Sequence, residues 1–137
     1  MFGEPRKELR TALVDLSRYI ATTRTAKHRV FQFLPVKIVA ESKVVCVASD
    51  DPFVLGVLSS STHTLWALAA GGWLGVGNDP TYNHSDCFNK FPFPDPTPDQ
   101  QARIRALAEE LDAHRKRQQA AYPDLTLTGL YNVLEKL

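Results

Sequence analysis

A proline-rich segment, Phe91-Pro-Phe-Pro-Asp-Pro-Thr-Pro98, constrains the fold of this chain more than any other feature. Proline has no backbone N–H to donate, so it is excluded from helix interiors and central strands. We therefore expect residues 86–94 to run as an edge strand into an extended segment. Thr97-Pro98-Asp99-Gln100 then forms a capping-box pattern, which predicts that a helix begins at Pro98.

That helix is predicted to run to about Gln118 and to stop before Tyr122-Pro123. A last short helix is predicted over residues 127–137. The apolar residues of the long helix recur on one face, at Ile104, Leu107 and Leu111. Its charged residues are expected to face mostly solvent: Glu109, Glu110, Asp112, Arg115, Lys116 and Arg117.

The first part of the chain mixes helical and strand patterns. A docking helix is predicted from Pro5, with its narrow apolar stripe at Leu9, Leu13 and Leu16. Strands are predicted at residues 19–23, 29–34 and 43–49, the first two joined by a basic turn at residues 24–28. The third strand is a continuous apolar run, which indicates burial on both faces.

Asp51-Pro52 predicts the start of a central helix, because aspartate caps helices and proline fits the first turn. This helix is expected to run to about Ala70 and to end at Gly71-Gly72. Its middle holds a patch of small residues (59–62) that allows close approach of a neighbouring segment. Its apolar stripe is predicted at Val54, Leu58, Leu65 and Leu68. Residues 71–85, here the glycine-rich loop, follow it.

These patterns predict an α+β fold with a small, twisted, mixed or antiparallel sheet and a packed central helix. A long C-terminal helix and a short terminal helix follow. We expect three parts: an N-terminal docking helix and linker (residues 1–17), a main domain (18–95) and a helical spacer (96–137). A chain of 137 residues is long enough to close one core.

The composition excludes several classes of protein. Sixteen basic and fifteen acidic residues give a net charge of +1, so any nucleic-acid contact must use a local patch. Cys46 and Cys87 are too few for a disulfide framework, which favours a reducing compartment. The sequence shows no signal peptide and no apolar run of about 18 residues. We therefore expect a cytoplasmic protein with no membrane partner.

Patterns typical of catalysis are weak. Ser59 to Ser61 lie beside His63, but close neighbours on one helix do not face each other in the geometry of a triad. His84 and Cys87 would need two distant ligands to hold a metal. There is no phosphate-binding loop and no dinucleotide fingerprint. We predict no catalytic residue and no metal site.

Patterns typical of nucleic-acid binding are better represented. Five Lys or Arg residues and no acid lie between Arg18 and Ala40, and such side chains neutralise phosphates. The glycine-rich loop carries short hydrogen-bonding side chains that can read base edges. A solvated basic hairpin and an ordinary Gly/Asn/Pro turn remain the plainer interpretations of these two segments.

Four stretches carry a resemblance to a known family: residues 18–29, 53–66, 82–94 and 125–132. They contain Phe53-Val-Leu-Gly-Val-Leu-Ser-Ser-Ser-Thr-His-Thr-Leu-Trp66, Cys87-Phe-Asn-Lys-Phe-Pro-Phe-Pro94 and Leu125-Thr-Leu-Thr-Gly-Leu-Tyr-Asn132. In this order they resemble the target recognition domain of MmeI-like proteins, which are restriction–modification enzymes and related N6-adenine DNA methyltransferases. The layout is also similar to half of a type I specificity subunit.

The resemblance implies a specificity module that binds double-stranded DNA. It also implies that a methyltransferase domain, absent from this chain, binds S-adenosylmethionine and methylates adenine. This chain itself would then be no enzyme and would hold no cofactor. The residues expected at DNA phosphates are Arg18, Arg24, Lys27, His28 and Arg29. Those expected at base edges are Lys43, Gly77, Asn78, Asp79, Thr81, Tyr82 and Asn83.

His63 and Trp66 recur in the family motif, and we interpret them as packing residues, with His63 bonded to backbone. Two alternatives stay open. The chain could be a protein-docking module that acts through its C-terminal amphipathic helices. It could also be a small metal-binding enzyme that uses His84 and Cys87.

Overall fold

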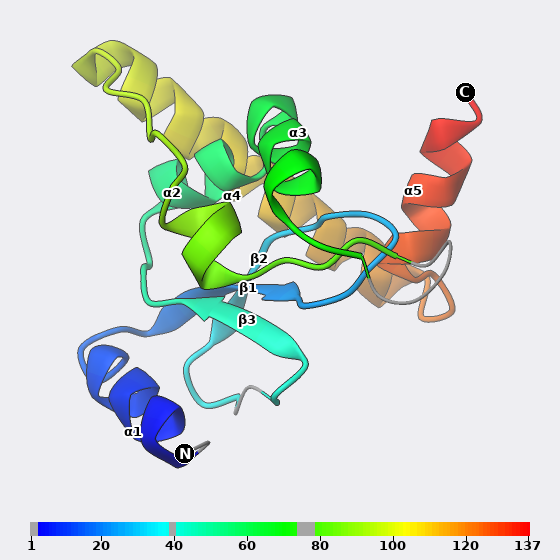
Figure 1. Ribbon diagram of the computed structural model, residues 1–137. Coiled ribbons are helices and arrows are strands. Elements are labelled where there is room, and N and C mark those ends of the chain that lie inside the picture. Colours follow the sequence, from blue (N-terminus) through cyan, green and yellow to red (C-terminus); the bar gives the residue numbers. More distant parts are fainter. Residues whose placement is uncertain (1–2, 39–40, 74–78) are drawn as a thin grey trace.

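A computed structural model of the chain describes residues 3–38, 41–73 and 79–137 and confirms the predicted α+β class (Figure 1). The elements run in the order α1 (Gly3–Ala12), β1 (Arg18–Thr23), β2 (Gln32–Pro35), β3 (Val44–Val47), α2 (Pro52–Leu58), α3 (Ser61–Ala70), η1 (His84–Phe88), α4 (Pro98–Ala121) and α5 (Leu127–Glu135).

The sheet has three antiparallel strands in the order β2-β1-β3. Ile20 of β1 lies opposite Phe33 of β2 and Val47 of β3, which fixes the register of all three strands. The predicted hairpin is confirmed, but β2 begins only at Gln32. The hairpin connection, residues 24–31, is therefore longer than the predicted basic turn.

Successive residues of the strands point to opposite faces of the sheet, and both faces are covered. One face carries Ile20, Phe33 and Val45 into the main core beneath the helices. The other face carries Tyr19 and Ala21, which pack against three leucines of the N-terminal segment: Leu9, Leu13 and Leu16. Figure 1 shows α1 on the side of the sheet away from α2 and α3. The third strand is buried on one face only, at Val45 and Val47, whereas Val44 and Cys46 on the other face are partly buried.

The predicted single central helix is wrong. The chain breaks at Ser59 and Ser60 into α2 and α3, which meet at 61°. Ser60 adopts an extended backbone, and its side chain accepts the His63 N–H at 3.2 Å as an N-cap. Serine favours this role because its hydroxyl replaces a missing intrahelical partner. The bend turns Leu65 and Leu68 away from the predicted stripe and leaves them exposed.

In the described part of the chain, no single helix has the length and hydropathy to cross a membrane. Only α2 and α3 taken together reach that threshold, and they are sharply bent at Ser59 and Ser60.

The predicted edge strand at residues 86–94 is also wrong. Residues 84–88 form the short π-helical turn η1, and Asn83 caps it by accepting the Asp86 N–H at 2.7 Å. This turn buries Cys87 against α3, and Phe91 packs edge-on against His63 and Trp66. The local Asn cap and these apolar contacts outweigh the extended preference of the prolines that follow.

Helix α4 begins with the predicted capping box at Thr97 and Gln100. It packs directly on α2, where the missing side chain of Gly56 admits Ile104. A Cβ at Gly56 would lie 2.6 Å from Ile104 Cγ2. Ala108 belongs to the main core. Helix α4 is therefore not a free spacer, since it completes the core formed by residues 18–95.

The predicted orientation of α4 is wrong in part. Leu107 is 63% exposed, whereas Asp112 and Arg115 are buried. The Asp112 carboxylate accepts the Phe33 N–H at 3.0 Å, and Arg115 Nη1 donates to the Phe31 carbonyl at 3.0 Å. Lys116 Nζ donates to the Phe33 carbonyl at 2.7 Å. These side chains bind backbone groups along β2, which in the described residues pairs only with β1.

Asp51 joins α2 to α4. Its carboxylate accepts the Phe53 N–H at 2.9 Å and receives two hydrogen bonds from Arg105, at 2.9 and 3.0 Å. The Arg105 guanidinium holds the pKa of Asp51 below its usual value. The helix cap predicted from Asp51-Pro52 is thus confirmed, and it also fixes where α4 begins to cross α2.

Candidate nucleic-acid interface

The structure brings the hairpin connection and the glycine-rich loop together, although about 50 residues separate them in the sequence. Thr25 and Thr81 form an antiparallel bridge. The Tyr82 N–H donates to the Arg24 carbonyl at 2.7 Å, and the Ala26 N–H donates to the Pro80 carbonyl at 3.3 Å. The two segments predicted to contact DNA therefore form one continuous surface.

The glycine-rich loop folds back on itself. Trp73 and Pro80 form a second antiparallel bridge, and the Thr81 N–H donates to the Gly72 carbonyl at 2.8 Å. Two predicted base-reading residues, Gly77 and Asn78, lie outside the described residues. Asp79 is exposed beside them, and Thr81 is half-buried.

Arg24 and Lys43 lie side by side at the end of the sheet, because the Arg24 N–H donates to the Lys43 carbonyl at 2.7 Å. Both side chains are exposed. The only hydrogen bond described for the Arg24 guanidinium is a long one, 3.4 Å from Nε to the Ser42 carbonyl. Arg24, predicted to bind a phosphate, is therefore available to one, and Lys43, which the sequence assigns to base edges, is exposed beside it.

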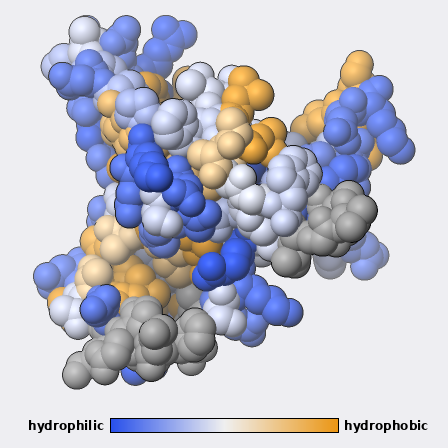
Figure 2. All heavy atoms as spheres, viewed as in Figure 1, coloured by the Kyte–Doolittle hydropathy of each residue, from blue (hydrophilic) through white to orange (hydrophobic). Residues whose placement is uncertain are grey.

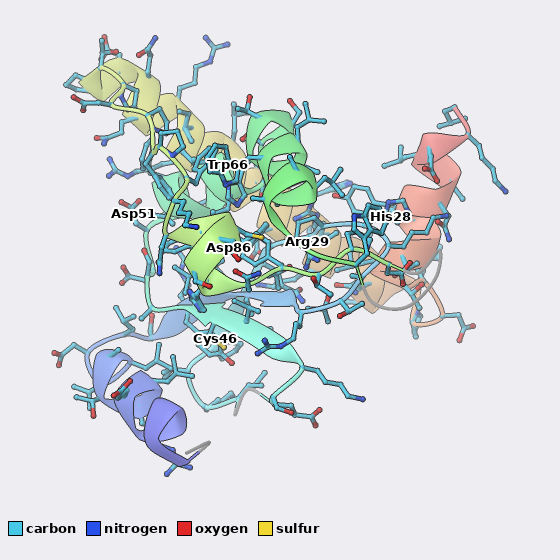
Figure 3. All side chains as sticks on the ribbon, in the orientation of Figure 1. His28, Arg29, Cys46, Asp51, Trp66 and Asp86 are labelled. Carbon is cyan, nitrogen blue, oxygen red and sulfur yellow. The ribbon has the colours of Figure 1, made fainter. Side chains whose placement is uncertain are left out.

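Three other predicted phosphate ligands have partners within the chain. Lys27 Nζ donates to Asn132 Oδ1 at 2.7 Å, and His28 Nε2 lies 2.8 Å from the same oxygen. Figure 3 shows His28 beside α5. Arg18 Nη2 lies 2.5 Å from Glu109 Oε1 on α4, and its guanidinium covers the Phe33 ring. These contacts hold α4 against β1 and α5 against the hairpin connection, which sequence spacing could not show.

Arg29 does not face solvent freely either. Its guanidinium is half-buried and donates to backbone carbonyls of both the hairpin connection and the glycine-rich loop. Figure 3 labels Arg29 where the hairpin connection meets the glycine-rich loop. Burial lowers the pKa of Arg29 from its usual value. The predicted phosphate role of Arg29 is therefore not supported by its geometry.

Two predicted base-reading residues have structural roles instead. Tyr82 is fully buried, and its hydroxyl lies 2.8 Å from His63 Nε2, so its predicted contact with bases is wrong. Asn83 uses its side-chain oxygen to cap η1. His63 packs as predicted, but its side chain pairs with the Tyr82 hydroxyl and not with backbone. Burial lowers the pKa of His63 to about 4 and raises that of Tyr82.

The proposed metal pair does not converge. His84 is exposed and packs edge-on against Phe88, whereas Cys87 is fully buried with its Sγ 3.9 Å from the Ala67 carbonyl. In residues 3–38, 41–73 and 79–137, no three His, Cys, Asp or Glu side chains gather at one point.

The family model of the MmeI target recognition domain matches residues 9–95, from within α1 to the middle of the proline-rich segment. The chain belongs to this family. Comparison with curated proteins gives no match, and neither does comparison with solved structures. Membership in the MmeI target recognition domain family assigns the chain to DNA sequence recognition in a restriction–modification enzyme. Helices α4 and α5 lie outside the matched residues.

Sequence reasoning missed one residue of this target recognition domain's candidate interface. Trp73 is 61% exposed at the base of the glycine-rich loop, opposite Pro80. Tryptophan is seldom so exposed without a partner, because its large apolar ring gains from burial. A tryptophan inside a Gly- and Asn-rich segment was the available signal, since turn residues alone do not require an aromatic side chain.

Gly71 is required where the glycine-rich loop returns to α3. A Cβ at Gly71 would lie 2.3 Å from the Thr81 carbonyl oxygen and 2.9 Å from the Ala67 carbonyl oxygen. Both obstacles are backbone, so we expect Gly71→Ala to lower the free energy of unfolding by about 2 kcal/mol, measured by chemical denaturation. Gly72→Ala is the matched control, because its Cβ would meet only Thr81 Oγ1 at 3.3 Å. Equal effects of the two substitutions would contradict this assignment.

Proposed function

We propose that this chain is the specificity module of a DNA methyltransferase or restriction–modification enzyme. It binds double-stranded DNA through the hairpin connection and the glycine-rich loop and has no catalytic centre of its own. A separate methyltransferase domain supplies the chemistry with S-adenosylmethionine, and the pair works in the cytoplasm. The observation that carries the proposal is the backbone pairing of residues 24–26 with residues 80–82, which joins the two segments into one surface.

The charges of this surface suit a duplex. Arg24 and Lys43 are exposed cations at one side of it, where they can neutralise backbone phosphates. Asp79 lies on the glycine-rich loop and offers a carboxylate that can accept from cytosine N4 in the major groove. Trp73 adds an exposed aromatic ring at the base of the same loop. Phosphate contacts thus lie beside groups that can distinguish bases, as sequence recognition requires.

Replacement of Arg24 with alanine tests this proposal. Binding to a mixed-sequence duplex is measured by fluorescence anisotropy over a series of salt concentrations. If Arg24 binds a phosphate, the slope of log K against log salt should become shallower by about 0.9 in Arg24→Ala, because one fewer counterion is released. Arg103→Ala is the control, since Arg103 is an exposed arginine on α4. Equal slopes for wild type and Arg24→Ala would argue against the proposed interface.

The apolar surface of α5 favours docking of a partner protein as a second function. No residue of α5 is buried in the described structure, and Val133, Leu134 and Leu137 are exposed. Figure 2 shows apolar atoms on α5 and on the outer side of α3. The opposite contacts of α5, from Asn132 to Lys27 and His28, hold this helix against the hairpin connection. A chain that binds no duplex even at low salt would leave docking as the main function.

A further inference from the structure

Arg29 makes more contacts than any other cation of the hairpin connection. Its Nη1 donates to Thr22 Oγ1 at 3.1 Å and to the Thr23 carbonyl. Its Nη2 donates to the Arg24 carbonyl at 3.4 Å and to the Pro80 carbonyl at 3.3 Å. One planar guanidinium therefore joins the end of β1 and the hairpin connection to the glycine-rich loop.

These contacts leave few N–H donors of Arg29 free to bind a phosphate. A guanidinium has five N–H donors, and each of the two terminal nitrogens of Arg29 already makes two hydrogen bonds. A phosphate at Arg29 would have to displace its hydrogen bonds to the carbonyls of Thr23, Arg24 and Pro80. The last two carbonyls also accept the Tyr82 and Ala26 N–H groups that pair the two segments. Arg24, five residues earlier, differs because its guanidinium is exposed and makes a single long hydrogen bond.

The contacts continue into the core through Tyr82. The Arg29 guanidinium lies over the Tyr82 ring, 5.2 Å from its centroid. The Tyr82 hydroxyl lies 2.8 Å from His63 Nε2 on α3, and the Phe31 ring packs edge-on against Tyr82. The glycine-rich loop is thus anchored at its far end to a buried network, with Arg29 as the outermost member.

We infer that Arg29 is a positioning residue for base recognition, which holds the glycine-rich loop in register against the hairpin connection. The inference rests on the proposed function. Lysine cannot replace arginine here, because a single ammonium group on a flexible stem cannot hold carbonyls of two segments in the fixed geometry of a planar fork. Loss of Arg29 should therefore impair the choice of sequence more than the electrostatic attraction to DNA.

The test compares the wild-type chain of 137 residues with Arg29→Met, Arg29→Lys and Arg24→Met. Three quantities are measured: the salt slope of binding to a mixed-sequence duplex, the enrichment of sequences bound from a randomised duplex library, and hydrogen exchange of the Ala26 and Tyr82 amides. Those two amides donate across the junction between the segments. Amides of α4 serve as the internal reference for global stability.

We expect Arg29→Met and Arg29→Lys to keep the wild-type salt slope, lose sequence enrichment and exchange the two junction amides about tenfold faster. Arg24→Met should do the opposite, with a slope shallower by about 0.9 and unchanged exchange. A slope that falls in Arg29→Met, with junction amides still protected, would overturn the inference and make Arg29 a phosphate ligand. Equal acceleration of the α4 amides would also overturn it, since the effect would be global.

The outcome for wild type separates this inference from the proposed function. If wild type binds no duplex, the proposed function fails, and hydrogen exchange in the Arg29 variants still decides whether Arg29 holds the loop. If wild type binds with sequence preference and both Arg29 variants keep that preference, the proposed function stands and the positioning role fails.

Discussion

Replacement of Asp112 with alanine is expected to lower the free energy of unfolding by about 3 kcal/mol. The substitution leaves the Phe33 N–H without its acceptor at 3.0 Å, in a position from which water is excluded. It also removes the carboxylate 2.5 Å from Lys116 Nζ. Lys116 is partly exposed, so most of the loss should come from the unpaired N–H of β2 and not from the ion pair.

Chemical denaturation of Asp112→Ala, Asp112→Asn and Glu110→Ala would separate these contributions. Asparagine retains an oxygen that can accept from the Phe33 N–H. Asp112→Asn should therefore lower the free energy of unfolding clearly less than Asp112→Ala does. Glu110 lies on the same helix and forms only an exposed pair with Arg117, so its loss should change stability by no more than about 0.5 kcal/mol. If Asp112→Ala lowered the free energy of unfolding no more than Glu110→Ala, the hydrogen bond from β2 to Asp112 of α4 would not stabilise the fold.

The stability of this protein is expected to fall by about 3 kcal/mol between pH 6.5 and pH 4 because of His63 alone. Burial lowers the pKa of His63 in the folded chain from 6.5 to about 4, with a smaller contribution from the Arg29 charge. Protonation therefore favours the unfolded chain throughout this interval. The stabilisation is complete above pH 6.5 and is lost as the pH falls toward 4.

Denaturant titrations of wild type and His63→Gln at several pH values measure this effect. The difference in stability between the two proteins should shrink as the pH falls, because glutamine does not titrate. Asp51, whose pKa is also lowered, contributes to acid loss in both proteins and cancels in the difference. His114→Gln is the control, since His114 is exposed on α4. A pH-independent difference would mean that His63 is protonated or solvated in the folded chain.

Local signals in the sequence were enough for the ends of several elements. The capping box at Thr97 and Gln100, the cap at Asp51 and the stop at Gly71 depend on residues within one helical turn. These local signals gave a wrong prediction where a helix cap and a helical apolar pattern occurred in the same segment. At Ser59 and Ser60 the apolar residues on both sides suggested one helix, but the Ser60 cap starts a second helix with a new direction.

The candidate interface was predictable in its segments and not in its individual residues. Basic composition marked the hairpin connection, and turn residues marked the glycine-rich loop. Of the cations assigned to phosphates, Arg24 is exposed with one long contact, whereas Lys27 and His28 face Asn132 on α5. Partners about a hundred residues away in the sequence leave no local pattern, and no spacing rule distinguishes a cation with a partner from a free one.

The sequence by itself determined the α+β class, the strand hairpin, the family and the place of the long helix, because each depends on local periodicity, caps or a motif. Only the tertiary structure decided which charges are buried. Asp112 and Arg115 look like solvent-facing residues of a helix, yet they bind Phe33 and Phe31 along β2. The physical reason is that an edge strand has backbone groups that need partners, and which distant side chains supply them depends on how the helix packs.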